Sequence, residues 1–358
     1  MNLKKSKSTK PPVKLGIIGA GFMGQVAHLM NYVEIENCEI VALAEMRPEL
    51  CSQVAQRYKI PETYPTHLDL LKNSNVEAVA IITIREMIGP IALDCLNAGK
   101  AVITEKPMAS TFQQAKILVD VAEKNNLIYK VGYMRLFDEG VQKAKKILDD
   151  IRSSNELGSI IFARVHCFGG SGYCNIDGHI MTDEPRPLEG NTWSGAPDWC
   201  PDNLKGQYNE YLNTYCHEIN LIRYLLEGSP KLSSVNFEHR AGRIAVLNFN
   251  SFIATIETGF YSFQGWDSKI EIFFEHGSLT LKTPPQMLRN VSAEIEIYKA
   301  RDLQVRTYPL SGWTWSFRRQ AEAFIEDVQR GKVGLGSGKD ALEDMRLIEE
   351  MWKKAAGL

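Results

Sequence analysis

A glycine-rich turn near the start of the chain constrains the fold more than any other feature. Its spacing is G-x-G-x-x-G; it follows an apolar run at 13–19 and precedes a run with helical periodicity at 22–34. In that context the first glycine permits a tight turn, the second lets the backbone approach a pyrophosphate, and the third allows close packing of helix against strand. We therefore expect a dinucleotide to bind along this turn, whose residues are Gly19, Ala20, Gly21, Phe22, Met23 and Gly24.

A carboxylate at the end of the second apolar run indicates which dinucleotide binds. Glu45 ends the run 39–45 and lies 45 − 24 = 21 residues beyond Gly24. A carboxylate there accepts hydrogen bonds from ribose hydroxyls and repels a 2′-phosphate, which favours NAD over NADP. Met46 and Arg47 follow and are expected beside the same ribose, where Arg47 could soften that preference. The alternatives are FAD, which usually binds to a longer and differently built chain, and a glycine turn without a ligand.

The chain up to about residue 132 alternates buried strands with helices. Continuous apolar strands separated by helices predict a doubly wound parallel sheet that is covered on both faces. The expected strands are 13–19, 39–45, 78–83, 101–104 and 127–131. The expected helices are 22–34, 48–58, 90–98 and 111–125.

The pattern then changes to strands that alternate apolar and polar residues, which predicts a mostly antiparallel, open-faced sheet with helices. The expected strands are 160–168, 235–239, 244–249, 252–260, 269–274, 278–282 and 293–298, and the expected helices are 140–151, 215–226, 315–330 and 339–355. We expect a lead-in at 1–12, a nucleotide-binding domain at 13–132 and a substrate-binding and oligomerisation domain at 133–358. The long irregular stretch before residue 215 contains Tyr173, Trp193, Trp199 and Tyr208, which either cover the core or stack on a sugar ring.

Composition argues against several classes of function. Lys+Arg is 41 and Asp+Glu is 43, so the net charge is 41 − 43 = −2, which gives no global field for nucleic acid or an anionic membrane. No apolar run approaches the roughly 20 residues that span a bilayer.

The seven cysteines form no C-x-x-C pair and predict reduced thiols in a cytoplasmic protein. Cys167, Cys174, His179 and Cys200 fit no zinc template, so no metal is expected. A broad sheet with an apolar face to cover favours a homodimer or homotetramer.

A lysine follows the fourth expected strand directly. In an open α/β sheet, ligands lie outside the carboxyl ends of the strands, so Lys106 is expected to project toward the nicotinamide end of the cleft. There it could exchange a proton with a hydroxyl. Glu105, beside it in the sequence Glu-Lys-Pro, and Thr83, at the end of the third strand, are expected next to the cofactor.

Four segments together resemble the Gfo/Idh/MocA family, the relatives of glucose–fructose oxidoreductase and inositol dehydrogenase. They are GIIGAGFMG at 16–24, AGKAVITEKPMA at 98–109, VGYMRLF at 131–137 and NTYCHEINLIRYLLEG at 213–228. The resemblance extends over nearly the whole chain from Val13. It implies a Rossmann domain, an open-faced antiparallel sheet, and reversible NAD(H)-dependent oxidation of a sugar or cyclitol hydroxyl.

The resemblance also implies roles for individual residues. In the inositol dehydrogenase branch, a lysine, an aspartate and a histidine four residues later surround the reacting alcohol. Lys106 and His217 match the lysine and the histidine, and either could be the base, while Asn213 stands where the aspartate is usual. Asn213 can orient the substrate by hydrogen bonds but cannot take a proton. Tyr133 is implied to line the substrate cleft, and Arg135 to line it beside the cofactor.

The chain departs from the family pattern elsewhere as well. The acid usual three residues after the histidine is Asn220, and the segment after Thr83 has Ile84 and Ile88 where the family often has proline and histidine. Met134 precedes Arg135 in place of a frequent asparagine. These departures leave open a second function: a non-catalytic sensor that keeps the dinucleotide fold. The retained lysine and histidine favour the enzyme.

Overall fold

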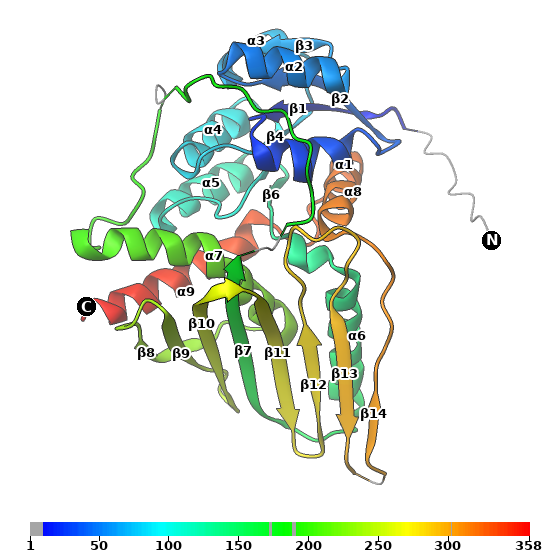
Figure 1. Cartoon of the computed structure of the whole chain (residues 1–358), viewed down its shortest axis with the longest axis vertical. Coiled ribbons are helices and arrows are strands. Elements are labelled where there is room, and N and C mark those ends of the chain that lie inside the picture. The colour runs from blue at the N-terminus through cyan, green and yellow to red at the C-terminus, as the bar shows by residue number, and fades with distance from the viewer. Residues whose placement is uncertain (1–9, 172–173, 188–190, 302) are drawn as a thin grey trace, which may run out of the picture.

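The computed structural model describes residues 10–171, 174–187, 191–301 and 303–358, which are built around two β-sheets (Figure 1). Residues 1–9 of the expected lead-in, and Tyr173, lie outside the described residues. Lys10 Nζ donates to the carbonyl of Gln329 at 2.6 Å, so the part of the lead-in that is described lies against the end of a C-terminal helix. No helix among the described residues is long and apolar enough to cross a bilayer.

The N-terminal sheet has six parallel strands in the order β3-β2-β1-β4-β5-β6, which confirms the expected doubly wound fold. The strand order reverses between β1 and β4, and in such sheets the ligand crevice lies at the carboxyl ends of the strands at that point. The strands are β1 Val13–Ile18, β2 Cys38–Ala44, β3 Glu62–Tyr64, β4 Ala78–Ile81, β5 Ala101–Thr104 and β6 Tyr129–Val131. The prediction missed β3, because three residues with two polar side chains carry no apolar run.

Helices cover both faces of this sheet. They are η1 Gly24–Leu29, α1 Met30–Tyr32, α2 Pro48–Tyr58, α3 His67–Asn73, α4 Arg85–Asn97 and α5 Phe112–Lys124. Two predictions need correction. Helix α4 begins at Arg85 and not at Pro90. A proline inside a helix removes one backbone hydrogen bond, but side-chain packing can offset that cost. Helix α3 was missed; Thr66 begins it by accepting the N–H of Asp69 at 3.1 Å.

The second sheet has eight strands in the order β14-β13-β12-β11-β7-β10-β9-β8. All its pairs are antiparallel except β7 with β10, so the expected mostly antiparallel sheet is confirmed. The strands are β7 Ile160–Ser171, β8 Lys231–Asn236, β9 Gly242–Asn248, β10 Ile253–Gln264, β11 Trp266–Phe274, β12 Gly277–Lys282, β13 Glu294–Lys299 and β14 Val305–Thr307. The helical elements of this half are η2 Met134–Phe137, α6 Glu139–Ser154, α7 Asp202–Leu226, α8 Ser316–Arg330 and α9 Gly338–Ala355.

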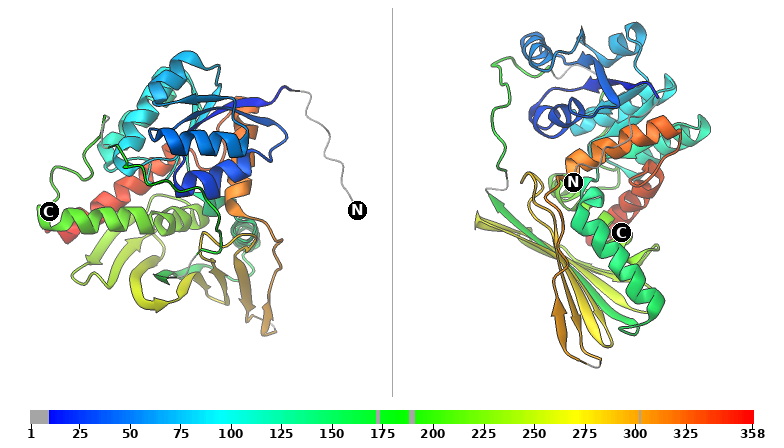
Figure 2. Two further views of the ribbon diagram at one scale, coloured as in Figure 1. Left: turned by 45° about the horizontal axis from the view of Figure 1, so that its top comes forward. Right: turned by 90° about the vertical axis from the view of Figure 1, so that its right-hand side faces the viewer.

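Two of these helices differ from expectation. Helix α7 begins at Asp202, thirteen residues before the predicted start, so Tyr208 lies in a helix and not in a loop. Helix α8 was expected with the second domain, but it lies beside α1 and β1 (Figures 1 and 2). Its apolar residues Ala321, Phe324 and Ile325 share a buried cluster with the first sheet. The C-terminal part of the chain therefore returns to complete the nucleotide-binding half.

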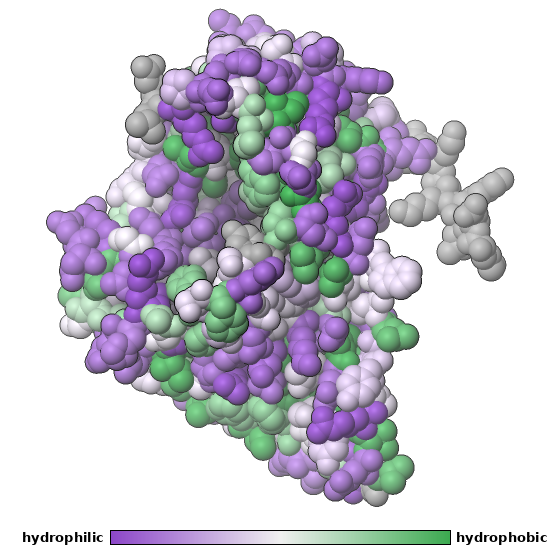
Figure 3. Space-filling model, in the orientation of Figure 1, coloured by the Kyte–Doolittle hydropathy of each residue, from purple (hydrophilic) through white to green (hydrophobic). Residues whose placement is uncertain are grey.

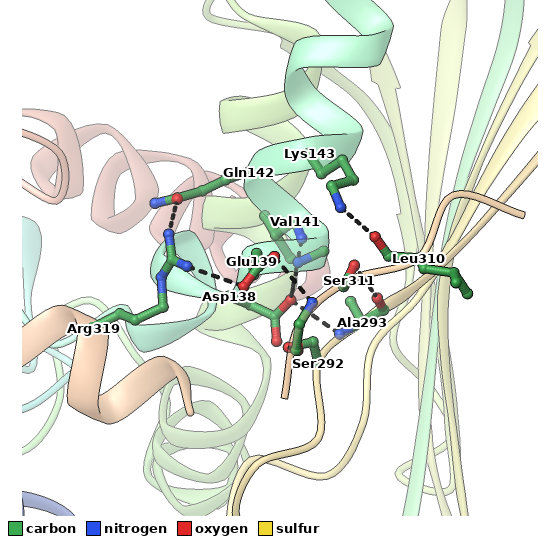
Figure 4. Close-up of polar contacts among 12 residues, drawn as sticks. Asp138, Glu139, Val141, Gln142, Lys143, Ser292, Ala293, Leu310, Ser311 and Arg319 are labelled. Carbon is green, nitrogen blue, oxygen red and sulfur yellow. Dashed lines mark hydrogen bonds and ion pairs between the residues drawn. The ribbon is translucent and has the colours of Figure 1, made fainter. Parts of the chain in front are cut away.

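A buried carboxylate fixes the junction between η2, α6 and the second sheet (Figure 4). Asp138 Oδ1 accepts backbone N–H groups from Gly140 at 2.8 Å and Val141 at 3.2 Å, which caps the start of α6. The same oxygen accepts the N–H of Ala293 at 3.0 Å, just before β13. Arg319 of α8 reaches this junction from the other side and donates to Gln142 at 2.5 Å.

The face of the second sheet that looks toward the viewer in Figure 1 carries no helix among the described residues, whereas α6 covers the opposite face (Figure 2). This open face mixes hydrophilic and hydrophobic residues (Figure 3). Arg164 and Glu257 form a two-pronged ion pair at its centre, with contacts of 2.9 and 2.6 Å. The apolar face expected to drive association is thus covered by helices of the same chain, and the open face is polar at its centre.

Candidate functional site

The glycine-rich turn has the geometry that a pyrophosphate requires. Gly19 has a φ of +97°, which favours glycine, and a Cβ there would lie 2.0 Å from the carbonyl oxygen of Ile82. A Cβ on Gly24 would lie 2.5 Å from the carbonyl oxygen of Gly19, so this residue permits the helix to pack on the strand. A Cβ at Gly21, in contrast, would meet no atom of the described residues within 4 Å, apart from its chain neighbours. The space over Gly21 is open, as close approach of a phosphate to the backbone demands.

Glu45 lies beside this turn, as the sequence predicts for a ribose-binding acid. Its Oε2 accepts the N–H of Ala20 at 2.8 Å, and its Oε1 accepts Nε of Arg47 at 2.8 Å. The carboxylate is therefore held in place at the end of β2, next to the first turn of the helix. The guanidinium of Arg47, which could attract a phosphate, is already engaged by Glu45. Met46 is half-buried between them and packs against the core.

A cavity of about 580 Å³ lies where the carboxyl ends of the first sheet meet α7 and the second sheet. Thr83 and Lys106 line it from the nucleotide-binding half, and Asn213 and His217 line it from α7. Met23 and Glu105, two of the expected cofactor residues, also line it. The fold thus brings the candidate residues of two distant sequence segments to one cavity, while the remaining turn residues and Glu45 lie outside its lining.

Lys106 bridges the two halves at this cavity. Its Nζ donates to the main-chain carbonyl oxygen of Asn213 at 2.7 Å and lies 3.5 Å from the side-chain oxygen of the same residue. The peptide bond between Lys106 and Pro107 is cis. The ammonium group is consequently fixed against α7, one helical turn before His217.

His217 is buried on the wall of the cavity. Its ring packs edge-on against Tyr133, with 5.8 Å between the ring centroids, and its Nδ1 has no hydrogen-bond partner among the described residues. Burial, followed by the positive charges of Lys106 and Arg135, lowers the pKa of His217 well below 6.5. The imidazole is therefore neutral at neutral pH and can accept a proton.

The side chain of Glu105 is held by contacts within the nucleotide-binding half. Its Oε1 lies 2.7 Å from Nε2 of His28, on η1, and its Oε2 accepts the backbone N–H of Lys106 at 3.1 Å. Burial opposes ionisation of Glu105, but the hydrogen bond and charge of His28, with Lys106, keep its pKa below the usual range. This pair anchors the turn that carries Lys106. Sequence reasoning missed His28, whose only signal was its place in the helix after the glycine turn.

Tyr133 and Arg135 do not line the cavity, contrary to expectation. The short helix η2 turns both side chains inward, and both are buried. Tyr133 supports the back of the His217 ring, and Arg135 forms a buried ion pair with Glu218 and stacks over Trp266 at 5.5 Å. Both residues therefore support the wall behind His217.

Asn220 is hydrogen-bonded to a carboxylate of another helix. Asn220 Nδ2 donates to Oδ2 of Asp344, on α9, at 2.8 Å, and Arg223 Nη1 donates to the other oxygen of Asp344 at 2.6 Å. Asp344 is fully buried. Neither Asn220 nor Arg223 lines the cavity, so this network fixes α7 further along the helix, and the departure at Asn220 is accommodated in packing.

Among the described residues, the aromatic side chains at the cavity are not those of the irregular stretch. Phe260, Tyr261 and Trp266 line it from the second sheet. Trp193 packs over Gly89 of α4, and Trp199 packs edge-on against the buried Tyr208 at 6.2 Å, so these rings cover the core. Arg85 also lines the cavity and was missed, although a charged residue four positions after the carboxyl end of β4 was the available signal.

Comparisons with known proteins agree with this geometry. Residues 13–133 match the model of the oxidoreductase family with an NAD-binding Rossmann fold, GFO_IDH_MocA. The chain is 24% identical over 344 residues to inositol 2-dehydrogenase of Pseudomonas fluorescens, covering 92% of this chain and 90% of the relative. A putative myo-inositol dehydrogenase from Sinorhizobium meliloti superposes with a TM-score of 0.70 at 20% identity, over 96% of this chain and 98% of that one. A 3-ketoreductase from Actinomadura kijaniata, in complex with NADP and TDP-benzene, superposes with a TM-score of 0.74 at 16% identity, over the same shares. These two likenesses show a shared fold.

Proposed function

The chain belongs to the Gfo/Idh/MocA family of oxidoreductases, and from this premise we propose that it is an NAD(H)-dependent dehydrogenase or reductase. Its substrate is a sugar, a sugar derivative or an inositol-like cyclitol, in which one hydroxyl-bearing carbon is oxidised to a ketone or the ketone is reduced. The relatives named inositol 2-dehydrogenase support this substrate class, as does the 3-ketoreductase fold.

One observation carries the proposal. Lys106 from the nucleotide-binding half and His217 from α7 line the same cavity, which lies at the carboxyl end of the first sheet. That edge of a doubly wound sheet is where the reactive end of a dinucleotide lies. A neutral imidazole can take the proton of a substrate hydroxyl, and a cation can stabilise the negative charge that develops on its oxygen.

The residues present fit a dinucleotide. The open space over Gly21 suits the pyrophosphate, the helix that follows the turn offers N–H groups to it, and Glu45 suits the ribose hydroxyls. Met23, Thr83 and Glu105 would flank the nicotinamide end, because they line the cavity beside Lys106. When bound, the nicotinamide ring supplies a hydride acceptor or donor. The carboxylate of Glu45, whose neighbour Arg47 is engaged, favours NAD over NADP.

His217 is assigned as the base and Lys106 as the group that stabilises the oxygen. The neutral imidazole takes the proton of the substrate hydroxyl as the C–H bond of the same carbon gives up its hydride. The ammonium of Lys106, held by the carbonyl oxygen of Asn213, donates to the substrate oxygen as negative charge develops there. The side chain of Asn213 orients a neighbouring hydroxyl. In the reverse direction His217 returns the proton to the ketone oxygen.

An absorbance assay tests this function. Purified protein is incubated with NAD⁺ and a panel of sugars, sugar phosphates, nucleotide sugars and inositols, and separately with NADH and the corresponding ketones. We expect the NADH absorbance band to rise in the first set and to fall in the second for at least one matched pair. Tight binding of NADH without turnover of any member would contradict the proposal and favour the sensor.

A further inference from the structure

A segment of the substrate-binding half crosses over the nucleotide-binding half. We call residues 174–187 the crossing segment; they follow β7 and precede α7 in the chain. Figure 1 shows this segment, in green, leaving the end of β7 and passing in front of the first sheet toward α2. The right-hand view of Figure 2 shows it as a separate layer along one side of the same half. Its position raises the question of which ligand surface it covers.

The crossing segment is bound to the helix that follows the glycine-rich turn. The buried side chain of Gln25 makes two hydrogen bonds to the backbone of Ile180, donating to its oxygen at 2.9 Å and accepting its N–H at 2.8 Å. The ring of His179 packs edge-on against Phe22 of the turn, with 4.9 Å between centroids. The segment therefore lies over the surface where the dinucleotide is expected.

The segment also places a carboxylate at the start of α2. The two oxygens of Glu184 accept the backbone N–H groups of Glu49 and Leu50, each at 2.9 Å, and Thr182 donates to Glu184 at 3.0 Å. Arg57, further along α2, donates to the carbonyl oxygen of Gly178 at 2.5 Å. Burial acts against the charged form, but the two N–H groups, Thr182 and Arg47 together lower the pKa of Glu184. The carboxylate is accordingly ionised at neutral pH.

This place in the fold receives the adenosine ribose. Helix α2 begins directly after Glu45 and Arg47, so its first N–H groups and Arg47 are the donors that a phosphate on the 2′ oxygen would use. Here Glu184 already accepts those N–H groups, and Glu45 already engages Arg47. We propose that Glu184 is a cofactor-specificity determinant supplied by the substrate-binding half, which excludes the 2′-phosphate of NADP(H) and leaves room for the free ribose of NAD(H). The inference rests on the proposed dinucleotide-dependent function.

The exclusion has two physical parts. First, the helix N–H groups that would bind a 2′-phosphate already donate to Glu184. Second, the phosphate would lie beside the negative charges of Glu45 and Glu184, with only the guanidinium of Arg47 to neutralise them. Like charges brought together repel each other strongly where water is excluded and less strongly near the surface. A free ribose hydroxyl meets neither obstacle, because it can donate to a carboxylate.

Calorimetric titration of NAD⁺ and NADP⁺ into the full chain tests this inference without knowledge of the substrate. The variants are Glu184→Gln, which keeps the shape and removes the charge, and Asp183→Asn, which removes an equal charge from an exposed neighbour in the same segment. We expect the wild type to prefer NAD⁺. In Glu184→Gln the Kd for NADP⁺ should fall by about tenfold, while that for NAD⁺ changes less than about threefold. Asp183→Asn should leave both unchanged.

The other outcomes are equally informative. An unchanged NADP⁺ to NAD⁺ ratio in Glu184→Gln, or an equal weakening of both, would overturn the inference and leave the segment a general clamp. Glu184→Ala should lower the ratio of the Kd for NADP⁺ to the Kd for NAD⁺, as Glu184→Gln does. Thermal unfolding checks that this variant is folded. Titration of ADP and adenosine 2′,5′-bisphosphate confines the test to the adenosine end. A wild type that binds ADP and NAD⁺ but oxidises no polyol would contradict the proposed function alone. The Kd values for NAD⁺ and NADP⁺ in Glu184→Gln would still decide the role of Glu184.

Discussion

Lys106 is the residue on which the chemistry depends most. Its ammonium reaches across to the carbonyl oxygen of Asn213 at 2.7 Å, so its position is fixed before substrate binds. Replacement by alanine removes the cation that stabilises the developing oxygen charge, and we expect kcat to fall about 10³-fold or more. The Kd for NADH should stay within about threefold, because the glycine turn and Glu45 are untouched.

The matched control for this prediction is Lys124→Ala, which removes a lysine from the exposed end of α5. Steady-state kinetics and fluorescence titration of NADH measure the two quantities. Full turnover in Lys106→Ala would refute the assignment of the lysine.

His217 gives a prediction for the pH dependence of the reaction. A base must be unprotonated to act, and burial with the charges of Lys106 and Arg135 places the pKa of His217 well below 6.5. The value of kcat/KM for alcohol oxidation should therefore hold as pH falls through 6.5 and should decline only at more acidic pH. A pH–rate profile with its acid limb at or above 6.5 would show that His217 is not a neutral buried base.

At the scale of elements, Asp138 joins the start of α6 to β13 through a single oxygen. Three backbone N–H groups lose their acceptor in Asp138→Ala, and two of them belong to the first turn of α6. We expect the free energy of unfolding to fall by about 2 kcal/mol. Asp150→Ala, on an exposed position of the same helix, is the control. Urea denaturation of both variants measures the difference, and equal midpoints would contradict the role of the junction.

Elements with strong local signals could be predicted from sequence, and those decided by tertiary contacts could not. Helix α2 has a proline at its first position and β5 is a short apolar run, so their bounds match the prediction. Helix α7 extends over thirteen more residues because Tyr208 and Tyr211 are buried against α9 and the second sheet. Strand β14 has three residues and forms only as a partner of β13.

The candidate site was predictable to the same extent. Lys106 follows a strand and His217 lies in a motif, so both could be named in advance, and both line the cavity. The inward turn of Tyr133 and Arg135 depends on how η2 packs against α7, which no local pattern encodes. The same holds for His28 and Glu184, whose partners lie 77 and 135 residues away in the chain.

At the scale of the whole molecule, the open face of the second sheet leads us to expect a homodimer or homotetramer. Near its central ion pairs this face also carries apolar residues, among them Ile253, which is 45% exposed and pairs in register with Phe162. Sedimentation velocity should give a mass of two or four chains. Ile253→Asp should shift it toward one chain, whereas Val333→Asp, beyond the end of α8, should not. A wild type that sediments as a single chain would contradict this expectation.

The proposed chemistry depends on an ammonium and an imidazole that act together on the oxygen of one substrate carbon. A crystal structure of the enzyme with NADH and a substrate identified by the absorbance assay tests this most directly. It should place the reacting carbon about 3.5 Å from C4 of the nicotinamide ring, with its oxygen within hydrogen-bond distance of both Lys106 Nζ and the ring of His217. A complex in which that oxygen contacts neither group, or in which the substrate lies outside the cavity, would contradict the account.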